Sequence, residues 1–213
     1  MFLANPATLS LSAGVATRRS TVKFTALACF LLCSIILLAQ KPALATKVGS
    51  VTLEQSITLD DAVMQLNGAG MRSRLFFKLY VGSLYVDESL KGRPANELIA
   101  ADAPMLVQLN VLSDLLTRDK FVAALDDGFK KATNGNTADI DDQITHMKDA
   151  VQQPIRPGDV FRIAYHPELG TRMTLGDELL ATFEGMPFKQ ALFGIWLSDK
   201  PVQKSLKAAM LGL

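Results

Sequence analysis

Arg72 and Tyr80 are the residues of this chain whose types most directly suggest ligand chemistry. An arginine guanidinium pairs with a carboxylate through two parallel hydrogen bonds, and a tyrosine phenol adds one donor. Both lie in the run from Leu66 to Val86, L-N-G-A-G-M-R-S-R-L-F-F-K-L-Y-V-G-S-L-Y-V. Read as one strand, the run places them on one face and about 26 Å apart. That spacing favours two points of an elongated pocket. The alternative is an arginine at a sheet edge and a tyrosine in the core.

Other residue types associated with catalysis do not form a recognisable site. His146 and His166 lack the spacing of a metal-binding pair, and we expect both on the surface. The acidic residues of segment 139–142 lack the glycine and distal glutamate of a calcium loop. Ser83 lies outside a G-x-S-x-G pattern, and the glycines of segment 68–70 lack a third glycine, so they predict a tight turn. The sequence therefore predicts no catalytic residue, no metal site and no cofactor.

Charge and cysteine content narrow the class of protein further. Residues 1–45 contain four of the 22 basic residues and none of the 21 acidic ones, so residues 46–213 carry a net charge of −3. No basic run follows, which argues against a nucleic-acid partner. The two cysteines, Cys29 and Cys33, both lie in the N-terminal apolar run. The rest of the chain therefore has no disulfide, thiolate metal site or cysteine nucleophile.

The N-terminal segment has the features of a secretory signal peptide. Residues 1–23 contain no acid and end with three cations, Phe24 to Ala39 is an apolar run, and Ala43-Leu44-Ala45 provides small residues for cleavage. We therefore predict a signal peptide over residues 1–45, cleavage after Ala45, and a periplasmic domain over residues 46–213.

Three alternatives to a cleaved signal peptide stay open. The apolar run is close to the shortest length that spans a bilayer, so it would also serve as an uncleaved membrane anchor. The hydroxyl-rich, acid-poor residues 1–23 also resemble an organellar transit segment, which we rank below a bacterial signal. A lipoprotein signal fits less well, because Leu32 occupies the position before Cys33 where a small residue is expected.

Hydrophobic periodicity in residues 46–213 predicts an α+β domain. Strands are expected in part of 46–59, over 63–86, 105–112, 159–165, 172–175 and 178–183, and helices over 95–100, 117–132, 137–151, 187–196 and 202–211. Gly176-Asp177 is a two-residue hairpin signal, and hairpin connections outnumber crossovers. The pattern predicts an antiparallel sheet covered on one face by helices.

Three segments resemble the chalcone isomerase-like family, in particular its bacterial exported branch. They are L-N-G-A-G-M-R with F-K-L-Y-V-G-S-L-Y-V, a helix ending D-D-G-F after an L-N-V-L strand, and F-K-Q-A-L-F-G-I-W-L-S-D-K-P-V before a short helix ending L-G-L. The resemblance covers nearly all of residues 46–213. It implies an open-faced β-sandwich, in which a large curved antiparallel sheet carries a layer of helices.

The resemblance also identifies the positions of a ligand cleft. In plant chalcone isomerases, which cyclise a chalcone to a flavanone, this cleft is lined by an arginine, a threonine, a tyrosine, an asparagine and a further threonine or serine. The positions similar to these are Arg72, Tyr80, Phe121, Gly128 and Ile195. Only the arginine is kept. Since each donor aimed at a developing oxyanion stabilises the transition state by about 3 kcal/mol, we expect no chalcone isomerase activity.

An arginine followed by a tyrosine at these positions is similar to the non-catalytic, fatty-acid-binding branch of the fold, where the two hold a carboxylate. We therefore predict a protein that binds a small apolar carboxylate, such as a fatty acid, through Arg72 and Tyr80. One alternative is an isomerase of the intramolecular lyase type that acts on another small substrate. A second is an interaction domain. Membrane contact is expected only through the N-terminal segment, if it is not cleaved.

Overall fold

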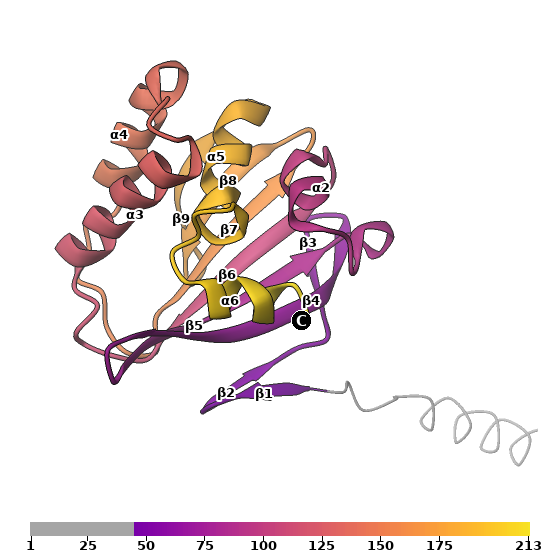
Figure 1. Ribbon diagram of the computed structural model, residues 1–213, viewed down its shortest axis with the longest axis vertical. Coiled ribbons are helices and arrows are strands. Elements are labelled where there is room, and N and C mark those ends of the chain that lie inside the picture. Colours follow the sequence, from indigo (N-terminus) through magenta and orange to yellow (C-terminus); the bar gives the residue numbers. More distant parts are fainter. Residues whose placement is uncertain (1–44) are drawn as a thin grey trace, which may run out of the picture. The chain divides into compact units, whose positions relative to one another are not determined.

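A seven-stranded antiparallel sheet is the largest element of residues 45–213, the part of the chain that the computed structural model describes. Its strands follow one another in sequence order: β3 (Ser56–Leu59), β4 (Ala62–Arg74), β5 (Phe77–Val86), β6 (Met105–Val111), β7 (Val160–His166), β8 (Gly170–Leu175) and β9 (Glu178–Phe183). The sheet is curved, and its helices lie against one face (Figure 1). The predicted α+β class is confirmed. Residues 1–44 of the predicted signal peptide, with both cysteines, lie outside the described residues.

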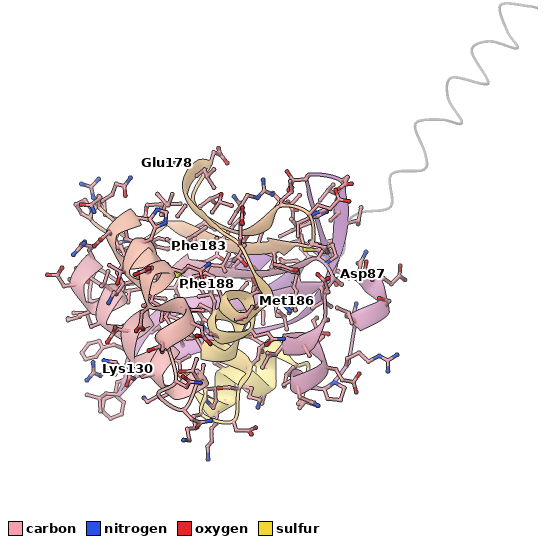
Figure 2. The ribbon with its side chains drawn as sticks, turned by 90° about the horizontal axis from the view of Figure 1, so that it is seen from above. Asp87, Lys130, Glu178, Phe183, Met186 and Phe188 are labelled. Carbon is pink, nitrogen blue, oxygen red and sulfur yellow. The ribbon has the colours of Figure 1, made fainter. Side chains whose placement is uncertain are left out.

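The helices bury the main hydrophobic core against the sheet. They are α2 (Ala95–Ala100), α3 (Arg118–Ala132), α4 (Asp141–Ala150), α5 (Met186–Leu197) and α6 (Lys204–Met210), with short 3-10 turns η1 (Glu88–Leu90) and η2 (Ala138–Ile140). Thr117 caps α3, where its side chain accepts a hydrogen bond from the backbone N–H of Lys120. Phe183 of β9 and Phe188 of α5, labelled in Figure 2, join the two layers with ring centroids 4.4 Å apart. Within residues 45–213, no helix combines the length and apolar character that crossing a bilayer requires.

The opposite face of the sheet carries a second, smaller core. The hairpin of β1 (Thr46–Val48) and β2 (Val51–Leu53) packs there, within the segment 46–59 where strand structure was expected in part. Side chains of β5 alternate between the two cores, with Leu84 in the main core and Val81 and Tyr85 in the second. The Tyr85 hydroxyl donates to the carbonyl of Glu54, 3.1 Å away, which ties the N-terminal hairpin to the sheet.

The predicted single strand from Leu66 to Val86 is wrong, because the chain reverses at Leu75 and Phe76. β4 ends at Arg74 and β5 begins two residues later. Leu75 has a φ of 56°, a left-handed conformation that is usually occupied by glycine or asparagine in such turns. Because leucine stands here instead, the sequence contains no turn signal at this point. Arg72 of β4 is therefore paired directly with Tyr80 of β5. The 26 Å spacing is replaced by a cross-strand distance of roughly 5 Å between Cβ atoms.

The predicted tight turn at residues 68–70 is also wrong, because both glycines lie inside β4. Helix α6 crosses the strand at this point. A Cβ atom on Gly68 would overlap the Ala209 carbonyl oxygen, and one on Gly70 would lie 2.6 Å from the Ala209 Cβ. Asn67 fixes the contact, since its Nδ2 donates to the Met210 carbonyl (2.9 Å). The glycines therefore allow close approach of a helix to the sheet.

We expect Gly70→Ala to lower the free energy of unfolding by about 1–3 kcal/mol, because its methyl group collides with Ala209. Adding Ala209→Gly removes the colliding atom. Although Ala209→Gly alone costs about 1 kcal/mol in helix propensity, the double variant should be more stable than the sum of the single variants predicts. Chemical denaturation measures this coupling.

Gly68→Ala provides the matched control for this cycle. Its collision is with a backbone oxygen, which Ala209→Gly leaves in place, so no rescue is expected. Equal rescue of both glycine variants, or an unchanged stability of Gly70→Ala, would show that α6 does not pack on β4 in this way.

Candidate functional site

An apolar cleft opens between the β4–β5 hairpin and helices α3 and α5. Its volume is about 400 Å³, within the range typical of small-molecule sites. The inner wall is formed by Leu79, Leu116, Phe121, Leu125, Ile195 and Trp196. Arg72, Arg74, Tyr80 and Lys120 add polar groups to this lining. A ligand with an apolar body and one anionic group matches this distribution.

Arg72 is held at the cleft by the residue that precedes α6. Its Nη1 donates to Gln203 Oε1 (2.9 Å) and to the Ser73 carbonyl (2.5 Å). Gln203 is itself fixed to β4, because its Oε1 accepts from the Ser73 backbone N–H (3.0 Å) and its Nε2 donates to the Met71 carbonyl (3.2 Å). Among residues 45–213, no carboxylate lies within 4 Å of the Arg72 guanidinium. Its charge is therefore available to an anionic ligand.

Tyr80 is positioned by a hydrogen bond from Trp196. The indole Nε1 donates to the phenol oxygen across 3.1 Å, and the Tyr80 side chain is only 6% exposed. Burial raises the pKa of Tyr80 above its usual value, against the opposing effects of the Trp196 hydrogen bond and the Arg72 charge. The phenol therefore stays protonated at neutral pH. Because Trp196 donates to the oxygen, the phenol proton remains to be donated to a ligand.

The structure brings together the positions that the sequence resemblance associated with the cleft. Arg72, Tyr80, Phe121 and Ile195 line it. Gly128 lies in an adjoining hollow of about 350 Å³, where its added Cβ would be 2.8 Å from Ile195 Cγ2. Helices α3 and α5 therefore pack directly against each other at Gly128.

The group of positively charged side chains at the opening of the cleft was not identified from the sequence. Arg72, Arg74 and Lys120 are shared by the apolar cleft and the adjoining hollow, to which Lys131 adds a fourth cation, paired with Asp127 at 2.6 Å. These residues come from β4 and α3, and only the packing of α3 over the hairpin places them together. Trp196 was missed as a partner of Tyr80 for the same reason.

Lys189 is a buried cation apart from the cleft lining. Its Nζ donates to the carbonyls of Leu98 (3.1 Å), Ile99 (2.9 Å) and Ala101 (2.7 Å), which are left unpaired at the end of α2. Burial lowers the pKa of Lys189 to about 8, although the charge of Asp102 opposes the shift. This lysine therefore satisfies the carbonyl groups at the C-terminal end of α2 and links α2 to α5.

The remaining titratable candidates do not gather into a site. His146 is exposed, and His166 lies 3.2 Å from the Asp61 carboxylate with a partly buried side chain. In the part of the chain that the structure describes, no three histidine, cysteine, aspartate or glutamate side chains are grouped to hold a metal ion. The cleft is therefore the strongest candidate for a ligand site.

The chain belongs to the chalcone isomerase-like family, whose sequence profile matches residues 45–212. The resemblance noted in the sequence is thus confirmed. Among solved structures, the chain is similar to the crystal structure of an Arabidopsis thaliana fatty-acid binding protein. The similarity covers 76% of this chain and 91% of that one, with 15% identity and a TM-score of 0.59. At this identity the likeness establishes the fold, the predicted open-faced sheet with helices. A comparison with curated proteins gives no significant match.

We expect Lys189→Met to lower the free energy of unfolding by about 2–3 kcal/mol, because it leaves buried carbonyl groups unpaired. The difference in the free energy of unfolding between Lys189→Met and wild type should also depend on pH. The pKa is about 8 in the folded protein and 10.5 in the unfolded chain. Between these values the unfolded chain binds more protons, so wild-type stability rises with pH, by up to about 1.4 kcal/mol per unit.

Urea denaturation across this pH range measures the effect, with the exposed Lys91→Met as the control variant. The Lys91 variant should follow the wild-type pH profile, whereas the Lys189 variant should lack the rise. Parallel profiles for wild type and Lys189→Met would contradict the lowered pKa.

Proposed function

We propose that this domain is a non-catalytic binding protein for a small apolar carboxylate, such as a fatty acid. The observation that carries the proposal is the Arg72 guanidinium, which has no carboxylate partner among the described residues and lies beside the Tyr80 phenol at an apolar cleft. The name of its structural neighbour, a fatty-acid binding protein, supports this choice of ligand.

The cleft chemistry fits the two ends of such a ligand. The carboxylate would accept hydrogen bonds from the free N–H groups of Arg72 and from the Tyr80 hydroxyl, and charge-assisted bonds of this kind are strong when water is excluded. The aliphatic chain would lie against Leu116, Phe121 and Leu125, where its burial is favourable. No polar side chain of the inner wall is left without a partner by this placement.

The same wall argues against an isomerase. Cyclisation needs donors preorganised around a developing oxyanion. Phe121 and Ile195 are apolar, and Gly128 offers no side chain. A carboxylate carries its negative charge before any reaction, so Arg72 and Tyr80 would give affinity for such a ligand without acceleration.

We further propose that the domain is exported to the periplasm after removal of residues 1–45. The signal-peptide pattern supports this, and strand β1 begins at Thr46, directly after the expected cleavage site. The absence of cysteine from residues 46–213 suits an oxidising compartment. N-terminal sequencing of the secreted protein tests the cleavage position.

We expect Arg72→Ala to weaken fatty-acid binding by about tenfold to a hundredfold, because it removes a charged hydrogen-bond donor from the carboxylate. Tyr80→Phe removes one neutral donor and should weaken binding by about three- to tenfold. Isothermal titration calorimetry with a saturated fatty acid measures both affinities, and circular dichroism checks the fold.

Arg93→Ala is the control, since Arg93 is exposed and lies 3.7 Å from Glu97, outside the cleft lining. Native mass spectrometry of the wild-type protein, followed by extraction, identifies any ligand that copurifies. The proposal fails if wild type binds no fatty acid, or if Arg72→Ala binds as tightly as Arg93→Ala.

A further inference from the structure

The hairpin between β4 and β5 ends in large apolar side chains that face solvent. Phe76 is 97% exposed, Leu75 84% and Phe77 55%, and the neighbouring Leu115 is 38% exposed. We call these four residues the apolar tip. Figure 1 shows the hairpin ending beside the connection that leads from β6 into α3. A turn of this length usually contains glycine, asparagine or aspartate, yet here leucine adopts a positive φ. The stability of the fold alone therefore does not explain why apolar residues occupy this turn.

Positive charge surrounds the apolar tip. Arg74, Lys78 and Lys120 are exposed beside it. Segments 72–78 and 113–120 together contain five basic residues and two acidic ones, although residues 46–213 as a whole carry a net negative charge. Of the two acids, Asp119 pairs with Arg118 at 3.2 Å and Asp114 is exposed. The cations are therefore concentrated where the exposed apolar side chains are.

This combination of a narrow apolar tip and surrounding cations matches the surface of an anionic bilayer. Aromatic and aliphatic side chains partition into the region between headgroups and acyl chains, while lysine and arginine attract the lipid phosphates. A stable protein partner would need about 800 Å² of surface on each side, from roughly 20–30 residues, which is far more than the four residues of the apolar tip provide. We propose that the apolar tip docks this protein on membranes rich in anionic phospholipid, with Phe76 inserted below the phosphates.

Docking in this way would turn the cleft toward the lipid. Three residues of the apolar tip, Leu75, Phe77 and Leu115, also line the cleft, as does the neighbouring Lys120. The cleft mouth would then open at the bilayer surface, and an apolar ligand would pass between the two without crossing water. The docking surface does not depend on the proposed fatty-acid ligand, because it is formed by side chains of the protein alone.

Two substitutions test docking without touching the cleft lining, Phe76→Ser and Lys78→Glu. The protein is produced from the full-length sequence, purified after processing, and sedimented with vesicles of phosphatidylcholine containing about one third phosphatidylglycerol. We expect wild type to bind these vesicles and to bind pure phosphatidylcholine vesicles at least about tenfold less. Phe76→Ser and Lys78→Glu should each lower the partition coefficient about tenfold or more.

Matched controls come from exposed residues elsewhere on the domain. Leu179→Ser makes a comparable change from a large apolar side chain to serine, at a residue 55% exposed on β9 beside Glu178, which is labelled in Figure 2. Lys91→Glu makes the same charge reversal outside the two segments around the tip. Both controls should bind vesicles like wild type, and all four variants should keep the wild-type affinity for soluble fatty acid.

Three results would overturn docking. The first is that wild type does not bind anionic vesicles, and the second is that Phe76→Ser binds them as wild type does. The third is that analytical ultracentrifugation finds a wild-type dimer that Phe76→Ser dissociates. The last result would make the tip a surface for self-association. Loss of fatty-acid binding with intact vesicle binding would instead contradict only the proposed ligand.

Discussion

The close contact between α6 and β4 is the interaction on which the cleft depends. Two glycines in β4 let the helix lie directly on the strand, and Asn67 bonds to the helix end. The same contact brings Gln203, at the start of α6, to the backbone of β4 and to the guanidinium of Arg72. The orientation of the main cation of the cleft is thus set by the last helix of the chain.

The fold class could be predicted because the spacing of apolar residues that distinguishes helices from strands can be recognised in the sequence itself. The helical periodicity of residues 117–132 and the Gly176-Asp177 hairpin are local signals, and each corresponds to an observed element. The β4–β5 reversal could not be predicted, because Leu75 and Phe76 are not turn residues. This one omission placed Arg72 and Tyr80 far apart, whereas they are cross-strand neighbours.

The partners of the candidate site residues could not be predicted at all, because they depend on contacts between distant segments. Trp196 lies 116 positions from Tyr80, and only the packing of α5 shows that its indole donates to that phenol. Lys189 offered a signal that could have been used. It lies in a helix that is apolar on nearly every side, so its burial follows from the sequence once the helix is recognised. The ligand-binding role of Arg72 and Tyr80 stays a prediction.

The bond between Asn67 and Met210 also has a consequence for the order of folding. It joins residues that are 143 positions apart, so a large loop must close before it forms. Neighbouring strands of the sheet are joined by shorter connections and are free to pair earlier. We expect Arg72 to reach its final orientation only when α6 docks. A nascent chain that has not yet emerged to Gln203 would contain most of the sheet without a competent binding site, so ligand affinity would be acquired only at the end of synthesis.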